Sequence, residues 1–72
     1  MEEDEKLMLV DQAITALEHL SDSKVTPLAV MAWLILHVHI DLSLTEIGRY
    51  MQMIYQKRGE HSSFTPPMQN PM

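Results

Sequence analysis

The four histidines are the residues of this 72-residue chain with the most versatile chemistry, because imidazole binds metals and transfers protons near neutral pH. Their spacing argues against a shared site. His37 and His39 lie two residues apart, so a helix would point them about 200° apart. His19 and His61 are distant from both in sequence, and the chain has neither a cysteine nor an HExxH motif. We therefore expect no bound metal and no cofactor.

Nucleophilic catalysis has no sequence signature either. A catalytic serine or threonine needs a histidine and an acid beside it in a pocket, which a domain of this size rarely encloses. The chain has no GxSxG motif, and its two glycines, Gly48 and Gly59, are too far apart to form a phosphate-binding loop. We therefore predict that the protein is not an enzyme and has no small-molecule substrate.

The charge of the chain is acidic and unevenly distributed. Five basic and ten acidic residues give a net charge of −5. Residues 1–22 hold seven of the acids against one lysine, whereas residues 23–72 hold three acids and four bases. Because DNA-binding domains usually carry a strongly basic face, this balance favours a protein partner over nucleic acid.

The composition also indicates where in the cell the protein is located. An acidic start does not resemble the basic start of a secretory signal, and the absence of cysteine suits a reducing compartment. The longest apolar run, residues 28–36, is about half of the roughly 20 residues that a spanning helix needs. We predict a cytoplasmic protein without a membrane span.

Hydrophobic periodicity predicts an all-α fold. Leu7, Val10 and Ile14 follow the spacing of one helix face, and Leu44, Ile47 and Met51 follow it again later in the chain. The low aromatic content also suits packed helices better than a sheet. The predicted helices cover about residues 4–20, 27–40 and 44–58 and form a domain over residues 1–60.

Local signals mark the ends of these helices. Thr26 followed by Pro27 is typical of a helix start, and Ser43 with Glu46 matches a capping box. Gly59 suits the position just after the end of the third helix. Prolines and polar residues predominate beyond it, so we predict a disordered tail over residues 61–72.

The predicted second helix carries no polar side chain over residues 28–36. A helix that is apolar all round must be covered on nearly every side, and exposed apolar patches usually mark interaction sites. We therefore predict that the second and third helices bind a protein partner or a second copy, forming a homodimer. Met31 and Trp33 also suit the core, so both roles stay open for them. The predicted partner-binding residues are Met31, Trp33, Ile35, Tyr50, Met53 and Tyr55.

The segment Asp-Leu-Ser-Leu-Thr-Glu-Ile-Gly-Arg-Tyr-Met at residues 41–51 resembles the helix-turn-helix DNA-binding domain of the bacterial replication initiator DnaA. Residues 58–64, Arg-Gly-Glu-His-Ser-Ser-Phe, resemble a distant version of the recognition helix of that family. The resemblance implies that Arg58, His61 and Ser62 contact DNA. It also implies that Gly48 is a point of close helix packing.

The chain departs from that family between the two motifs. Residues 52–57 are longer than the family's turn and lack its glycine, which predicts that the third helix continues through them. The sequence is therefore compatible with two functions: a regulatory or adaptor protein that binds another protein, and a DNA-binding regulator. A helix broken near residues 52–55 would favour DNA binding, and a continuous helix would count strongly against it. The candidate DNA-binding residues are Arg49, Lys57, Arg58, His61 and Ser62.

Overall fold

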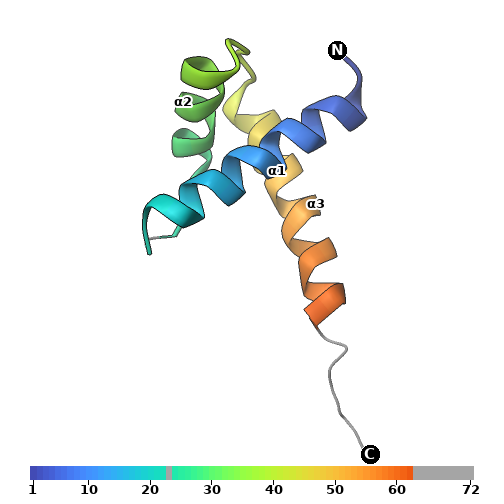
Figure 1. Cartoon of the computed structure of the whole chain (residues 1–72). Coiled ribbons are helices and arrows are strands. Elements are labelled where there is room, and N and C mark those ends of the chain that lie inside the picture. The colour runs from blue at the N-terminus through green and yellow to red at the C-terminus, as the bar shows by residue number, and fades with distance from the viewer. Residues whose placement is uncertain (23, 63–72) are drawn as a thin grey trace, which may run out of the picture.

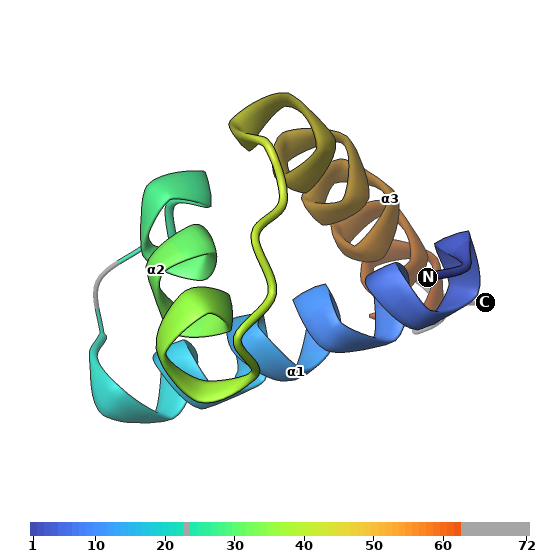
Figure 2. The same cartoon turned by 90° about the horizontal axis from the view of Figure 1, so that it is seen from above.

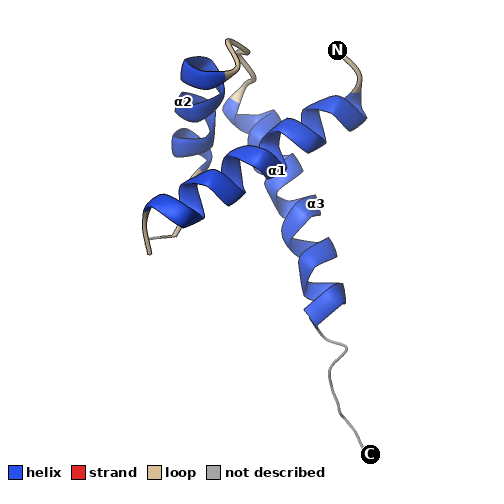
Figure 3. Cartoon of the chain, in the orientation of Figure 1, coloured by secondary structure: helices blue, strands red, loops and turns tan. Residues whose placement is uncertain are grey.

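The computed structural model describes residues 1–22 and 24–62 of the chain. They form three helices, α1 (Glu3–Leu20), α2 (Pro27–His37) and α3 (Leu44–Ser62), which short loops connect (Figures 1 and 3). This arrangement confirms the predicted all-α fold of three helices. None of the helices in the described ranges is both long and apolar enough to cross a membrane. Residues 61 and 62 of the predicted tail belong to α3, and residues 63–72 lie outside the described part of the chain.

The predicted helix starts are formed by side chains that accept hydrogen bonds from free backbone N–H groups. The Thr26 hydroxyl accepts from the backbone N–H of Ala29 at 3.2 Å, and Pro27 occupies the first turn of α2. The Ser43 hydroxyl accepts from the backbone N–H of Glu46 at 3.1 Å at the start of α3. The start of each of these two helices therefore depends on side chains within four consecutive residues.

The end of α2 differs from the prediction. The helix ends at His37, three residues before the expected end, and the backbone N–H groups of Val38 and Ile40 both donate to the carbonyl of Leu34, at 3.0 and 3.3 Å. Between them, His39 has a φ of 61°, in the left-handed region that usually ends a helix. Histidine enters this region more readily than most residues other than glycine, which explains why the chain turns here.

The predicted end of α3 at residue 58 is also wrong. The helix passes through Gly59 and continues to Ser62, since a glycine inside a helix costs only about 0.5–1 kcal/mol and does not by itself stop it. The prediction that residues 52–57 are helical is confirmed. No helix-turn-helix break therefore lies between Met51 and Arg58.

All three helices contribute to one core. In Figure 1 α1 crosses over α3, and α2 lies at one end of the molecule, where it packs against both other helices (Figures 1 and 2). Tyr50 is the largest side chain of this core and is only 2% exposed. It therefore belongs to the core and offers almost no surface for the partner binding that the sequence predicts. The core consists of Val10, Ala13, Ile14, Val30, Leu34, Leu42, Ile47, Tyr50, Met51 and Ile54.

The role that the DnaA resemblance implied for Gly48 is not seen. A methyl group built at Gly48 meets no atom of another helix within 4 Å, so no neighbouring helix requires a glycine at this position. The same is true of Gly59. Both glycines thus weaken α3 without a packing benefit in the described part of the chain.

Replacing Gly48 with alanine should therefore stabilise the protein. We expect the free energy of unfolding of Gly48→Ala to rise by about 0.5–1 kcal/mol, because alanine restricts the unfolded chain and favours the helix. Urea denaturation followed by circular dichroism measures the change. Gly59→Ala serves as the control and should give a smaller gain near the helix end. A destabilised Gly48→Ala variant would show that this position packs closely after all.

Candidate functional site

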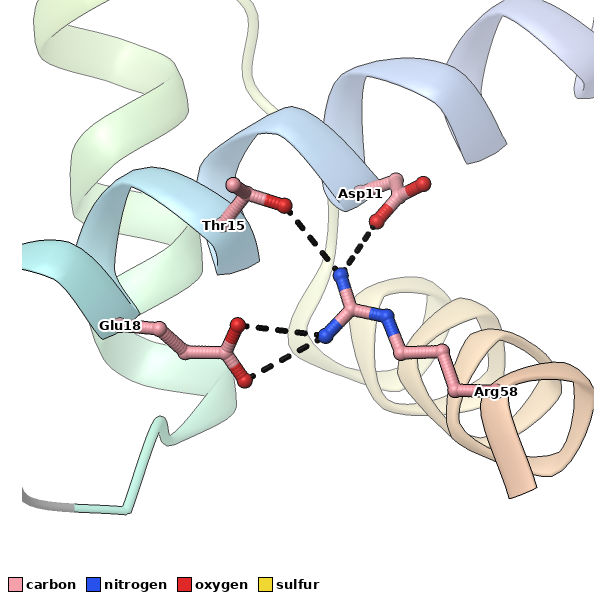
Figure 4. Close-up of polar contacts among 4 residues, drawn as sticks. All are labelled: Asp11, Thr15, Glu18 and Arg58. Carbon is pink, nitrogen blue, oxygen red and sulfur yellow. Dashed lines mark hydrogen bonds and ion pairs between the residues drawn. The ribbon is translucent and has the colours of Figure 1, made fainter. Parts of the chain in front are cut away.

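Arg58 joins α3 to α1 through three side chains on one face of α1 (Figure 4). Its Nη2 donates to Asp11 Oδ1 at 2.6 Å and to Thr15 Oγ1 at 3.2 Å. Its Nη1 donates to both carboxylate oxygens of Glu18, at 3.2 and 3.3 Å. Asp11, Thr15 and Glu18 follow the i, i+4, i+7 spacing that places them in one row. We call this group of four residues the Arg58 cluster.

The electrostatics of the Arg58 cluster decide what Arg58 can bind. Partial burial acts to lower the pKa of Arg58, but the hydrogen bonds and charges of Asp11 and Glu18 outweigh it and raise the pKa. Two carboxylates thus compensate a single guanidinium. A DNA phosphate would have to compete with both of them for Arg58.

The other candidate DNA-binding residues do not gather around Arg58. Arg49 is exposed, and its guanidinium lies 5.4 Å from the ring centre of its neighbour Tyr50. Lys57 is exposed and lines a groove between α1 and α3. The backbones of His61 and Ser62 belong to the last turn of α3, and their side chains lie outside the description.

A second ion pair connects α1 to the start of α3. Lys6 Nζ lies 3.1 Å from Glu46 Oε2. The hydrogen bond from Lys6 lowers the pKa of Glu46, and the backbone of Ser43 lowers it further, as the reciprocal half of the predicted capping box requires. The hydrogen bond to Glu46 in turn raises the pKa of Lys6. Together with the Arg58 cluster, this pair links α1 and α3 on both sides of their crossing.

An exposed apolar surface lies on α2. Val30 and Leu34 point into the core and are fully buried, so the side chains on the opposite side of the helix face solvent. Leu28 is 61% exposed, Ile35 42% and Leu36 71%. No charged residue lies within residues 27–36. The outer face of α2 consists of Leu28, Ala32, Ile35 and Leu36, all exposed.

The structure divides the predicted partner-binding residues among several places. Ile35 belongs to the outer face of α2, whereas Met53 and Tyr55 are exposed on α3. Met31 and Trp33 are half-buried and pack against the core, where the ring of Trp33 stacks on that of His37 with 4.8 Å between ring centres. These side chains therefore do not form one surface.

Leu28 and Leu36, the most exposed of the large apolar side chains of α2, are not among the predicted partner-binding residues. A signal for them existed, because the two leucines lie eight residues apart and so share a helix face. The apolar pattern alone did not show which face would be covered.

The groove between α1 and α3, which Lys57 lines, is a second surface that could bind a partner. It has a volume of about 650 Å³. Met8 and the 42% exposed Met53 contribute flexible apolar surface, while Lys57 and the ion pair of Arg58 with Asp11 add charge to its lining. It is therefore less suited than the outer face of α2 to an uncharged apolar partner.

Among the side chains that the structure describes, no three histidine or acidic groups come together in a way that could hold a metal ion. Asp11 and Glu18, both on α1, already share Arg58. Comparison of the chain with protein-family models, curated proteins and solved structures gives no match. The geometry of the surface is therefore the basis for assigning a function.

Removing the charge of Arg58 should loosen the contact between α1 and α3. We expect Arg58→Met to lower the free energy of unfolding by about 1 kcal/mol, because Asp11, Thr15 and Glu18 lose their shared donor. Lys57→Met is the matched control, since it removes a charge from the adjacent exposed position, and it should change stability little. Urea denaturation measures both variants, and equal effects would show that the cluster adds no stability.

The Lys6–Glu46 pair should make stability depend on pH. The pKa of Glu46 is lower in the folded protein than its usual value of 4.5, so its contribution is present above that value and is lost as pH falls through the folded pKa. We expect Glu46→Gln to melt at a lower temperature than the natural protein at about pH 7, and the difference to shrink as the pH falls below 4.5 through the folded pKa. Glu2→Gln, at an exposed acid without a capping hydrogen bond, is the control. A difference that persists in acid would contradict this role of Glu46.

Proposed function

We propose that this protein is a small, non-enzymatic regulatory or adaptor protein that acts by binding another protein surface through the outer face of α2. The observation that carries the proposal is the exposure of Leu28, Ile35 and Leu36 on a helix whose residues 27–36 contain no charge. Contiguous apolar surface of this kind usually marks an interaction site. Its cytoplasmic location is part of the proposal, because the chain has no cysteine to form disulfides.

The chemistry of the face indicates the chemistry of its partner. Each leucine or isoleucine that becomes fully buried contributes about 1.5–3 kcal/mol, so covering these three side chains would stabilise a complex. A charged partner surface would lose hydration without gaining an ion pair. We therefore propose an apolar, uncharged face on the partner, of about the length of the 11-residue α2.

DNA binding remains the alternative function, but no feature of the described residues favours it. The helix that would have to break is continuous, and Arg58 is held by two acids. Arg49 and Lys57 alone would contact few phosphates, and each phosphate contact contributes to affinity. For these reasons the protein-binding proposal takes precedence.

Photocrosslinking in the cell that makes the protein tests the proposal. Ile35 and Met53 are equally exposed at 42%, so a benzophenone amino acid at either position samples a different apolar surface with matched access. We expect a discrete crosslinked protein from position 35 and none from position 53. The additional substitution Leu36→Glu should abolish the product, because it places a charge on the outer face.

Two controls make the outcome decisive. The melting temperature of Leu36→Glu should stay close to that of the natural protein, because Leu36 is 71% exposed and contributes little to the core. Products from position 53 alone would contradict the use of the outer face of α2. A gain in mass with duplex DNA at low salt, measured by light scattering and lost at high salt, would instead support the DNA-binding alternative.

A further inference from the structure

The outer face of α2 has a symmetry that points to its partner. Building on the proposed function, we infer that the partner is a second copy of this chain, with the two α2 helices packed antiparallel across a two-fold axis at Ala32. The inference depends on three features of the described residues: the order of side chains along the face, the charges beyond its ends, and the position of the acidic segment of α1.

The order of side chains reads the same in both directions. Leu28 lies four residues before Ala32 and Leu36 lies four residues after it, so the three form one row along the helix. When two such helices run antiparallel and cross at Ala32, Leu28 of each copy faces Leu36 of the other. The small side chain of Ala32 lets the helix axes approach where they cross.

The side chains beside this row also follow the two-fold axis. Ile35 lies three residues after Ala32 and Ala29 three residues before it, so the two flank the row on opposite sides. The axis places both Ile35 side chains on one side of the row and both Ala29 side chains on the other. The same apolar patch of each copy thus meets itself, as a two-fold interface requires.

Charges beyond the ends of α2 agree with this register. Lys24 lies eight residues before Ala32 and Asp41 nine residues after it, and both are exposed. The antiparallel arrangement brings Lys24 of each copy close to Asp41 of the other, which forms two equivalent attractive contacts. Asp22 lies two residues further from α2, and Glu18 lines the same pocket as Asp22 and Lys24.

These two charges are too far apart to attract each other strongly within one chain. The 11 residues of α2 separate them by about 16 Å along the helix, which exceeds the screening length of about 8 Å at physiological salt. Within the described residues neither side chain forms an ion pair. If the effect of changing one of these charges on dimerisation depends on the sign of the other, the two charges must lie in contact between copies.

The acidic segment of the chain does not oppose this dimer. Glu3, Asp4 and Glu5 occupy the first turn of α1. Figures 1 and 2 both place this end of α1 at the opposite end of the molecule from α2. Two copies joined through α2 thus keep their most acidic ends apart. Because a single short helix from each copy forms the contact, we expect a reversible dimer that dissociates on dilution through micromolar concentrations.

Charge reversal at both ends of α2 tests the arrangement. Sedimentation velocity on a dilution series of the purified full chain, at low salt, gives the dimer dissociation constant. We expect Lys24→Glu and Asp41→Lys each to raise it by about threefold to tenfold, because each places two like charges in contact. The double variant should return within about twofold of the natural protein, since the pair is restored with its signs exchanged.

Three controls separate dimerisation from folding and from other partners. Each reversed charge lies between the end of one helix and the start of the next, so the effects on the two helix dipoles offset each other and melting temperatures should change little. High salt should reduce the effect of the charge reversals. Leu36→Glu should remove the dimer at every salt concentration, whereas Met53→Glu, at an exposed site outside this face, should leave it intact.

The outcomes distinguish this inference from the function on which it rests. A protein that is monomeric at all concentrations, while position 35 still crosslinks to a different protein, overturns the second copy and leaves the proposed function standing. A dimer that the double variant does not restore overturns the antiparallel register. A monomer without any crosslink from position 35 overturns both the inference and the proposed function.

Discussion

The packing of Val30 and Leu34 against the crossed helices α1 and α3 is the contact on which the rest of this structure depends. These two side chains are completely buried, and they fix the rotation of α2 about its own axis. Because a helix places residues at 100° intervals, that rotation also decides which side chains point outward. Leu28, Ile35 and Leu36 are exposed as a direct consequence. The same rotation of α2 therefore determines both the core and the proposed binding surface.

The crossing of α1 and α3, which receives α2, is held by reciprocal ion pairs. Lys6 of α1 binds an acid of α3, and Arg58 of α3 binds acids of α1. Exposed pairs of this kind are weak one at a time, but here they lie on both sides of the crossing and resist rotation of one helix over the other. The acidity of α1 therefore serves, in part, to hold the fold together. These acids also compensate the positive charge of Arg58, which a DNA-binding function would need.

A protein of this size has little stability to spare, because a small domain buries a limited share of its surface. Keeping two leucines and an isoleucine in water forgoes stabilisation that the chain alone cannot recover. Burial of these side chains in a dimer would recover this stabilisation. Because only the folded chain can dimerise, its stability would then rise with protein concentration. The symmetric order of Leu28, Ala32 and Leu36 is consistent with this link between folding and assembly.

The sequence by itself determined the helices and their starts, because these depend on neighbours within a few residues. Apolar spacing predicted α1 and most of α3, and Thr26 and Ser43 accept the backbone hydrogen bonds that their positions predicted. The tertiary structure decided the rest. A helix that is apolar all round has no pattern that selects its buried side, so packing alone exposed Leu36 and buried Val30. The partners of Arg58 lie 40 to 47 residues away, and no local rule chooses among acids at that distance.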